Sequence, residues 1–220
     1  MRLGIIVGGG VLEENFARSF LQKRLAQEEG VCLIAADRGL LFLKHCGILP
    51  DYIVGDFDSA DASVLEAYRA EPRVTIKKLN PEKDWTDTEV AAQLAMEQGC
   101  ERIEILGGTG GRIDHLLGNL QLLALIREQG ADGYLLDAKN RIYLRNGSFT
   151  VRREEQWGKY VSLFAYGGDV TGLKLEGFKY QVEDFTLGTV GTRGVSNEIT
   201  APQARVSFLA GKLLVVEARD

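Results

Sequence analysis

The 220-residue sequence predicts an α/β domain followed by an all-β, sandwich-like domain. Continuous apolar runs alternate with amphipathic helical patterns up to about residue 137, which is typical of a parallel sheet covered by helices on both faces. After about residue 140 the helical period disappears, and short β-rich runs with glycine-rich joints follow. We therefore expect one domain over residues 1–138 and a second over residues 139–220.

In the first domain, six apolar runs predict strands, over residues 2–7, 31–37, 51–56, 74–79, 102–108 and 133–138. Helical patterns lie between them, over residues 11–30, 39–46, 61–70, 86–99 and 112–130. Thr86 and Glu89 have the spacing of a capping box at the start of the fourth helix. The fifth helix is expected to bury one stripe, formed by Ile113, Leu116, Leu117, Leu120 and Ala124. This alternation predicts a Rossmann-like parallel sheet flanked by helices.

In the second domain, Asn146-Gly147 separates two β-rich runs and predicts a hairpin with a type I′ turn. Further strands are expected over residues 159–166, 170–175, 204–211 and 212–218. These short strands predict a small sandwich or barrel.

Composition and charge narrow the class of protein. The chain is 45% hydrophobic and 26% charged, which excludes disorder, and its net charge of −5 argues against a nucleic-acid partner. No apolar run approaches the length of a membrane span, and the N-terminus lacks the pattern of a signal peptide. The three cysteines, Cys32, Cys46 and Cys100, show no metal-ligand spacing and are expected to be buried, reduced residues. We expect a cytoplasmic protein.

Glycines and carboxylates follow five successive predicted strands. They are Gly8–Gly10 after the first, Asp37 and Arg38 after the second, Gly55, Asp56 and Asp58 after the third, Lys83, Asp84, Thr86 and Asp87 after the fourth, and Gly107–His115 after the fifth. Because ligands of open parallel sheets bind beyond the carboxyl ends of the strands, these residues are expected to share one site.

The six carboxylates of this edge are Asp37, Asp56, Asp58, Asp84, Asp87 and Asp114. So many like charges would repel one another without a cation, and carboxylate oxygens are the ligands that Mg²⁺ prefers. The sequence therefore favours a magnesium site. The alternative is local: Asp56 and Asp58 would cap the following helix, and Asp84 and Asp87 would only favour a helix N-terminus.

Neither glycine loop matches a named phosphate-binding fingerprint, although each opens a helix whose free N–H groups favour an anion. For Gly8–Gly10 a tight turn is an equally good interpretation. For Gly107–Gly111 we favour phosphate contact, because the always-charged Arg112 follows directly. Two interpretations of His115 are equally good, as a residue that contacts a ligand or as a hydrogen-bonded helix residue. His45 is expected to be structural.

Five segments, AADRG, PDYIVGDFDS, KDWTDTEVA, GGTGGRIDHLLGNLQLL and GVSNE, occur in the order seen in thiamine pyrophosphokinases. The resemblance runs from about Ile5 to Val216. It implies an α/β nucleotide-binding domain joined to a C-terminal β-domain that serves thiamine binding and dimerisation. It also implies transfer of a pyrophosphoryl group from ATP to the thiamine hydroxyl, with Mg²⁺ and release of AMP. ATP and thiamine would be the substrates, and the protein would be a homodimer.

Carried over by motif, the resemblance implies Mg²⁺ ligands at Asp56, Asp58 and Asp87. It adds Asp84 and Asp114 to the catalytic group and suggests Asp37 or Asp84 as an outer-shell ligand or proton acceptor. The nucleotide-binding residues would be Asp37, Arg38, Lys83, Thr86, Gly107, Gly110, Gly111, Arg112 and His115. Thiamine would be contacted by Tyr180, Ser196 and Asn197, where Tyr180 takes the place of a frequent tryptophan.

Two other functions are compatible with the residues alone. A different Mg²⁺-dependent nucleotidyltransferase would use Asp56 and Asp58 as its metal motif, and it would release pyrophosphate instead of AMP. A non-catalytic sensor would bind ATP and thiamine without turnover. The number of carboxylates argues against the sensor, because binding alone needs no such cation cluster.

Overall fold

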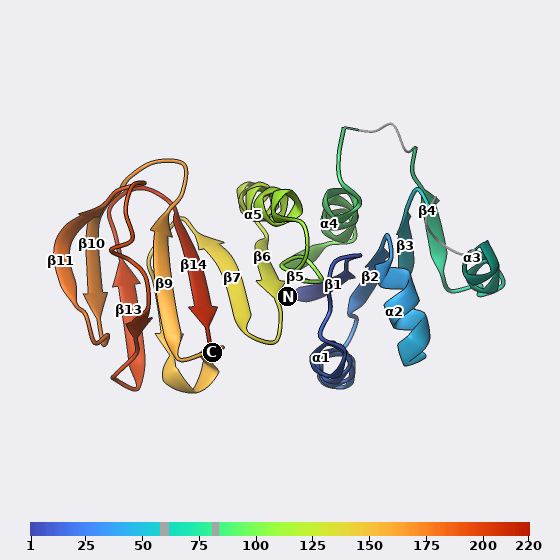
Figure 1. Ribbon diagram of the computed structural model, residues 1–220, viewed down its shortest axis with the longest axis horizontal. Helices are drawn as coiled ribbons and strands as arrows, with labels where there is room; N and C mark the ends of the chain where they lie inside the picture. Colours follow the sequence, from blue (N-terminus) through green and yellow to red (C-terminus); the bar gives the residue numbers. More distant parts are fainter. Residues whose placement is uncertain (58–61, 81–83) are drawn as a thin grey trace. The chain divides into compact units, whose positions relative to one another are not determined.

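The computed structural model describes residues 1–57, 62–80 and 84–220 of the chain. It divides into two compact units, Met1–Ala138 and Lys139–Asp220, which are described separately as the α/β unit and the β unit (Figure 1).

The α/β unit contains a six-stranded sheet in which all neighbouring strands are parallel. Its strands are β1 (Arg2–Val7), β2 (Cys32–Ala36), β3 (Tyr52–Gly55), β4 (Thr75–Lys78), β5 (Cys100–Leu106) and β6 (Asp132–Leu136). They are arranged in the order β6-β5-β1-β2-β3-β4. The chain thus moves outward from β1 to β4 and then returns to the other side of β1, so the order of the strands reverses between β1 and β5.

Five helices connect these strands, and they are α1 (Glu14–Gln27), α2 (Gly39–Cys46), α3 (Ala62–Arg69), α4 (Asp87–Glu97) and α5 (Ile113–Glu128). Helices α4 and α5 lie on one face of the sheet, and α1 and α2 lie on the other (Figure 1). This arrangement confirms the predicted parallel sheet flanked by helices. Among the helices in the described ranges, none is long and apolar enough to cross a membrane.

The central strands of the α/β unit are buried because helices cover both faces. Strands β1 and β2 carry runs of almost fully buried aliphatic residues, including Ile5, Ile6 and Ile34. All three cysteines are free; Cys32 and Cys100 are buried as expected, whereas Cys46 is only half-buried.

Helix α5 does not bury the stripe that its sequence predicts. The buried residues are Asn119, Leu122, Leu123 and Ile126, whereas Ile113 and Leu117 are 72% and 57% exposed. Apolar residues occur on every side of this leucine-rich helix, so the spacing of apolar residues in its sequence does not indicate which face is buried. The packing of α5 against β6 and α4 selects the face instead.

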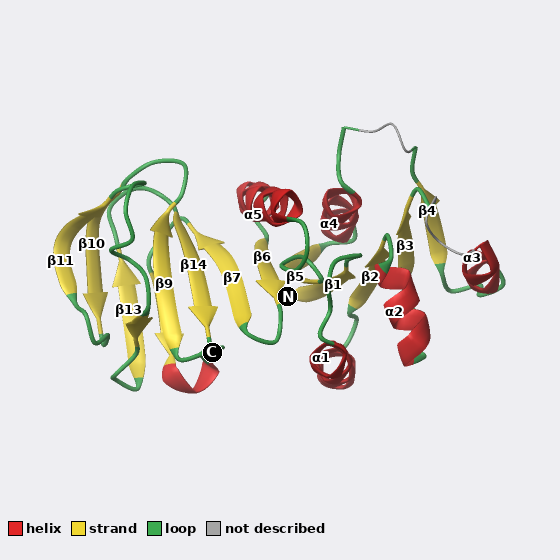
Figure 2. Cartoon of the chain, in the orientation of Figure 1, coloured by secondary structure: helices red, strands yellow, loops and turns green. Residues whose placement is uncertain are grey.

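The β unit is a two-layer sandwich, as predicted, and its one helical segment is a short 3-10 helix over Arg153–Glu155, drawn red in Figure 2. Its strands are β7 (Asn140–Arg145), β8 (Phe149–Arg152), β9 (Tyr160–Ala165), β10 (Val170–Glu176), β11 (Val182–Leu187), β12 (Asn197–Glu198), β13 (Gln203–Ser207) and β14 (Leu213–Ala218). One antiparallel layer has the order β12-β9-β14-β7 and the other has the order β11-β10-β13-β8. Strands β11 and β12 were not expected from the sequence.

The predicted hairpin at Asn146-Gly147 is wrong. Strand β7 pairs with β14, and β8 pairs with β13 in the other layer, so the chain crosses between layers at this turn. Neither Asn146 nor Gly147 has the positive φ that a type I′ turn requires. The local signal for a turn was correct, but the partners of the two strands are distant in sequence.

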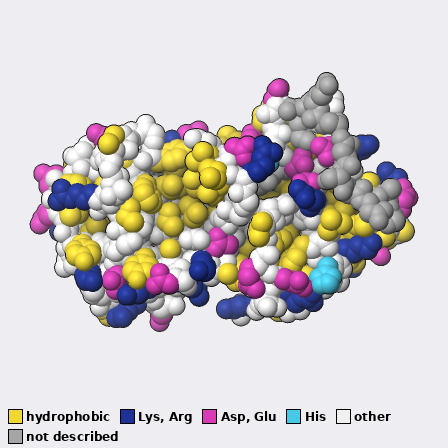
Figure 3. All heavy atoms as spheres, in the orientation of Figure 1, with side chains coloured by type: hydrophobic (Ala, Val, Ile, Leu, Met, Phe, Trp, Pro, Cys, Tyr) yellow, Lys and Arg dark blue, Asp and Glu magenta, His cyan; other side chains and the backbone are white. Residues whose placement is uncertain are grey.

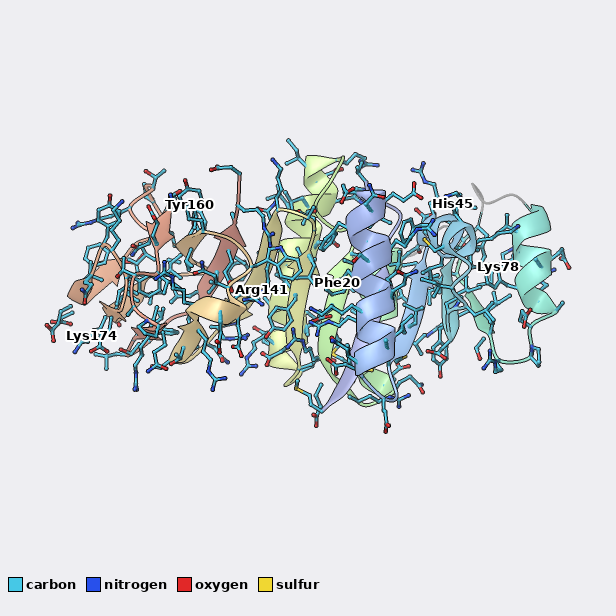
Figure 4. The ribbon with its side chains drawn as sticks, turned by 90° about the horizontal axis from the view of Figure 1, so that it is seen from below. Phe20, His45, Lys78, Arg141, Tyr160 and Lys174 are labelled. Carbon is cyan, nitrogen blue, oxygen red and sulfur yellow. The ribbon has the colours of Figure 1, made fainter. Side chains whose placement is uncertain are left out.

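Each unit contains a buried glutamate that is bound by arginine. In the α/β unit, Glu104 of β5 is fully buried and accepts hydrogen bonds from Arg24 of α1 (2.7 and 2.9 Å) and Arg102 (2.6 and 2.9 Å). Arg24 also lies over the ring of Phe20, which is labelled in Figure 4. In the β unit, Glu217 accepts bonds from Arg141, which Figure 4 also labels, and from the Trp157 amide.

We predict that Glu104→Ala destabilises the α/β unit by about 3 kcal/mol or more, because two arginines would lose their buried carboxylate. Urea denaturation followed by circular dichroism measures this loss. Glu101→Ala on the same strand is the control, since its side chain is 67% exposed and should change stability by less than about 0.5 kcal/mol. Equal stabilities of the two variants would contradict the prediction.

Candidate functional site

A cavity of about 540 Å³ lies at the carboxyl ends of β1, β2 and β5, where the strand order reverses. Its walls come from the loops after these strands and from the N-terminal turns of α4 and α5. The lining residues are Gly9, Gly10, Val11, Asp37, Arg38, Thr86, Asp87, Thr88, Gly107, Gly108, Gly110, Gly111, Arg112, His115 and Asn119. Most residues assigned to the nucleotide from the sequence therefore lie around one cavity.

The two glycine loops pack directly against each other. A Cβ atom on Gly10 would lie 2.2 Å from the carbonyl oxygen of Gly107, and one on Gly107 would lie 2.7 Å from the carbonyl oxygen of Gly8. Gly107 also has a φ of +72°, which disfavours any side chain. Close packing between the loops thus requires glycine at both positions, whatever ligand they bind.

Glycines of both loops line the cavity, so their backbone N–H groups lie at its wall. Within the described part of the chain, the amides of Gly9, Gly10, Gly110 and Gly111 donate no hydrogen bond. Helix α5 begins directly after the second loop, so its partial positive charge adds to these donors. This end of the cavity can therefore hold an anion such as a phosphate group.

Two side chains fix the Gly107–Gly111 loop. Asn119 of α5 donates from Nδ2 to the carbonyl oxygen of Gly108 (2.9 Å), and Thr109 donates from Oγ1 to Asp137 at the end of β6 (2.6 Å). The sequence analysis did not identify Asn119. A polar residue four positions after His115, on a helix rich in leucine, was the available signal.

Carboxylates gather at the other end of the cavity. Asp37 has a φ of 51°, and its carboxylate lies so close to Gly9 that a Cβ there would come within 2.5 Å of Oδ2. Burial raises the pKa of Asp37, and the charges of Asp87 and Asp56 raise it further. Figure 3 shows acidic side chains, in magenta, gathered on the α/β unit near α4. The structure thus brings Asp37, Asp56 and Asp87 within electrostatic reach of one another.

Among the described residues of this edge, Asp56 and Asp84 do not line the cavity. Asp58 and Lys83 lie outside the described residues, and Asp84 is exposed before the start of α4. Among the side chains that the structure describes, no three carboxylate, histidine or cysteine groups lie close enough to hold a metal ion. The described residues therefore supply only Asp56 and Asp87 of the three expected metal ligands.

Asp114 contacts Arg112 instead of the cavity. Arg112 donates from Nε and Nη2 to the two carboxylate oxygens of Asp114, with 3.0 Å between Nε and Oδ1. This ion pair lowers the pKa of Asp114 to about 2. The bidentate contact leaves Nη1 of Arg112 for another oxygen ligand, and Arg112 itself lines the cavity. Asp114 thus orients Arg112 and does not line the cavity, and its catalytic role stays a prediction.

Thr86 serves the predicted cap. Its Oγ1 accepts a hydrogen bond from the Glu89 amide (3.2 Å), so Thr86 is the N-cap of α4, whose first residue is Asp87. The cap holds the first turn of α4, with Thr86, Asp87 and Thr88, against the cavity.

A second cavity, of about 500 Å³, lies within the β unit. Its walls are mainly apolar, and the lining residues are Leu163, Leu173, Leu175, Lys179, Tyr180, Gln181, Val182, Phe185, Leu187, Arg193, Gly194, Val195 and Asn197. Tyr180 and Asn197, both predicted to contact thiamine, are among them. Ser196 is not; its φ is 59° and its amide donates to Ser162 Oγ (2.9 Å).

Comparison with known proteins finds the same division of the chain. The family model described as "Thiamin pyrophosphokinase, catalytic domain" matches residues 24–135, and the one described as "Thiamin pyrophosphokinase, vitamin B1 binding domain" matches residues 148–213. The chain is 32% identical to the thiamine pyrophosphokinase of Bacillus subtilis, over 88% of this chain and 90% of that protein.

Solved structures are similar over nearly the full length. The crystal structure of thiamine pyrophosphokinase from Bacillus subtilis has a TM-score of 0.87 at 30% identity and covers 99% of each chain. The crystal structure of thiamin pyrophosphokinase from Geobacillus thermodenitrificans has a TM-score of 0.83 at 31% identity, covering 99% of this chain and 98% of that chain.

We predict that Gly10→Ala weakens both the fold and the anion site, because the new Cβ would displace the Gly107 loop. The expected result is a loss of at least about 2 kcal/mol in unfolding free energy, measured by urea denaturation. Gly118→Ala is the matched control, since nothing lies near that position on α5 and alanine there should stabilise the helix by about 0.5–1 kcal/mol. A Gly10→Ala variant as stable as the wild type would contradict the packing argument.

Proposed function

The chain belongs to the thiamin pyrophosphokinase family, and from that membership we propose that the cavity of the α/β unit binds ATP. The enzyme transfers the pyrophosphoryl group of ATP to the hydroxyl of thiamine, which gives thiamine diphosphate and AMP. The observation that carries the ATP site is the row of glycine amides that have no acceptor among the described residues, at the point where the strand order of the sheet reverses.

In this proposal the phosphates lie against the Gly107–Gly111 loop. The amides of Gly110 and Gly111 donate to phosphate oxygens, and Arg112 adds charge through the Nη1 group that Asp114 leaves unused. Asn119 and Thr109 hold the loop in place while the ligand binds. Phosphoryl transfer depends mainly on such positioning and on charge stabilisation.

Mg²⁺ is the cofactor that the acidic end of the cavity fits. Asp37, Asp56 and Asp87 offer only hard oxygen donors. Burial raises the pKa of Asp37, the charges of Asp87 and Asp56 raise it further, and a divalent cation would relieve that repulsion. We assign Asp56 and Asp87 as ligands together with Asp58, which lies outside the described residues. Bound there, the ion would neutralise charge on the transferred group and on the departing AMP.

The remaining carboxylates, Asp37 and Asp84, lie on the side of the reaction that involves the thiamine hydroxyl. The thiamine hydroxyl oxygen forms the new bond to the β-phosphorus as the bridging bond to AMP breaks, and the hydroxyl proton needs an acceptor. We assign Asp37 and Asp84 to the outer shell of the metal or to this proton transfer. Asp37 has the more restrained position of the two, against Gly9.

The β unit supplies thiamine contacts in this proposal. Tyr180 is 61% exposed at the cavity of about 500 Å³, and an aromatic ring there can stack on the cationic thiazolium. Ser196 contributes through its backbone position next to Asn197. The three free cysteines agree with a cytoplasmic location, which we also propose.

A homodimer is also part of the proposal. Ile113 and Leu117 lie one turn apart on α5 and are largely exposed, although both were expected in the core. Exposed aliphatic residues grouped on a helix are typical of an interface. We assign this part of α5 to contact with a second copy of the chain.

The reaction itself is tested by incubating the protein with ATP, Mg²⁺ and thiamine. We predict formation of thiamine diphosphate and AMP in equal amounts, measured by liquid chromatography. Release of pyrophosphate instead of AMP would indicate a nucleotidyltransferase, and binding without turnover would indicate a sensor.

We predict that Asp87→Asn lowers kcat by at least about 100-fold, because the metal would lose an anionic ligand. The same result is expected for Asp58→Asn. Asp184→Asn is the control, since it makes the same chemical change at an exposed position of the β unit. Circular dichroism checks that each variant is folded. Near-native turnover of Asp87→Asn would overturn its assignment as a ligand.

We predict that Leu117→Glu shifts the protein from dimer to monomer, because a buried contact would acquire an unpaired charge. Sedimentation velocity measures the change, and Leu209→Glu, at a position that is 85% exposed, is the control. A monomeric wild-type protein would contradict the dimer, whereas a dimeric Leu117→Glu variant would remove α5 from the interface.

A further inference from the structure

Two motifs that are separate in the sequence form one structural unit in the β unit. The segment Gly177–Tyr180 lies beside the segment that begins with β12. The Lys179 amide donates to the carbonyl oxygen of Glu198 (2.8 Å), Phe178 forms an antiparallel bridge with Ile199, and the Thr200 amide donates to Gly177 (2.9 Å). Phe178, which is 1% exposed, anchors the first segment in the core.

The side chain of Asn197 continues this pairing by one residue. Its Oδ1 accepts a hydrogen bond from the Tyr180 amide (3.0 Å), and its Nδ2 donates to the Tyr180 carbonyl oxygen (2.7 Å). Oδ1 also accepts from the Glu198 amide (2.9 Å). The carboxamide thus replaces a neighbouring strand for Tyr180, with both of its polar atoms in use.

This arrangement separates the roles of the two residues. Asn197 is 8% exposed, and its donor and acceptor are both directed at Tyr180, so a ligand could bind its carboxamide only by displacing these bonds. Tyr180 is fixed through its backbone, while its ring is 61% exposed and lines the cavity. Lys179 lies over the same ring, 5.4 Å from its centre, and is itself held by Glu198 (3.2 Å).

We propose that Asn197 is a positioning residue that clamps the backbone of Tyr180 and so holds the tyrosine ring in place for the thiamine ring. The proposal rests on the role of Tyr180 given under the proposed function. A ring that is already fixed loses little conformational freedom when the substrate binds, so the clamp lowers KM for thiamine and leaves the ATP site unchanged.

The kinetic test uses Asn197→Asp, which keeps the size of the side chain but removes the donor to the Tyr180 carbonyl. We expect KM for thiamine to rise about tenfold or more, with kcat and KM for ATP within about twofold of the wild type. Asn15→Asp, at an exposed position at the start of α1, is the matched control and should change none of these constants. A rise in KM for ATP equal to that for thiamine would overturn the positioning role.

The double variant with Tyr180→Ala tests whether Asn197 acts through Tyr180. We expect Tyr180→Ala to raise KM for thiamine and Asn197→Asp to add no further increase in that background. Full additivity of the two changes would overturn the clamp as the route of action. If Tyr180→Ala left KM for thiamine unchanged, the assignment of Tyr180 under the proposed function would fail, and the positioning role would fail with it.

Amide hydrogen exchange tests the clamp independently of catalysis. In Asn197→Ala the Tyr180 amide loses its acceptor and should exchange at least about tenfold faster, whereas the Lys179 amide, which is bonded to Glu198, should keep its protection. Unchanged protection at Tyr180 would overturn the clamp. The same loss of protection at both amides would indicate general loosening and would also overturn it.

Discussion

The close approach of the first glycine loop to Gly107 is the contact on which the α/β site depends. It lies at the ends of the paired strands β1 and β5, at the point where the strand order reverses, and leaves no room for a side chain at Gly10. Among the described residues, the amides of Gly9, Gly10, Gly110 and Gly111 have no internal acceptor, and all four glycines line the cavity. The packing and the anion site thus have the same physical origin.

Charge organises the rest of that cavity. One end offers amides, a helix N-terminus and Arg112, while at the other end burial and the charges of neighbouring carboxylates raise the pKa of Asp37. A polyphosphate beside carboxylates would be repelled, so the two ends are compatible with one ligand only if a cation lies between them. This balance is the physical reason for proposing Mg²⁺. Asp114 belongs to the cationic end, where it orients Arg112.

The β unit uses polar side chains differently. Glu217 and Arg141 face each other across β14 and β7 and fix one layer of the sandwich from within. Near its cavity, hydrogen bonds from a single carboxamide define the backbone at Tyr180, where regular strand pairing stops. In both places a buried polar side chain fixes the backbone, and only at Tyr180 does an exposed aromatic ring line a cavity beside it.

Local sequence signals determined the alternation of strands and helices, the bounds of α2 at residues 39–46, the cap at Thr86 and the residues that follow each strand. These features depend on neighbours within a few positions, so periodicity and residue type suffice to predict them. Only the tertiary structure decided which face of α5 is buried, which layers β7 and β8 join, and that Asp114 and Asn197 contact protein groups. The contacts of Asn197 depend on atoms of Tyr180 that are brought close only by folding. The buried face of α5 and the layers of β7 and β8 depend on which distant segment of the chain packs against each element. The order of apolar and polar residues does not encode those distances.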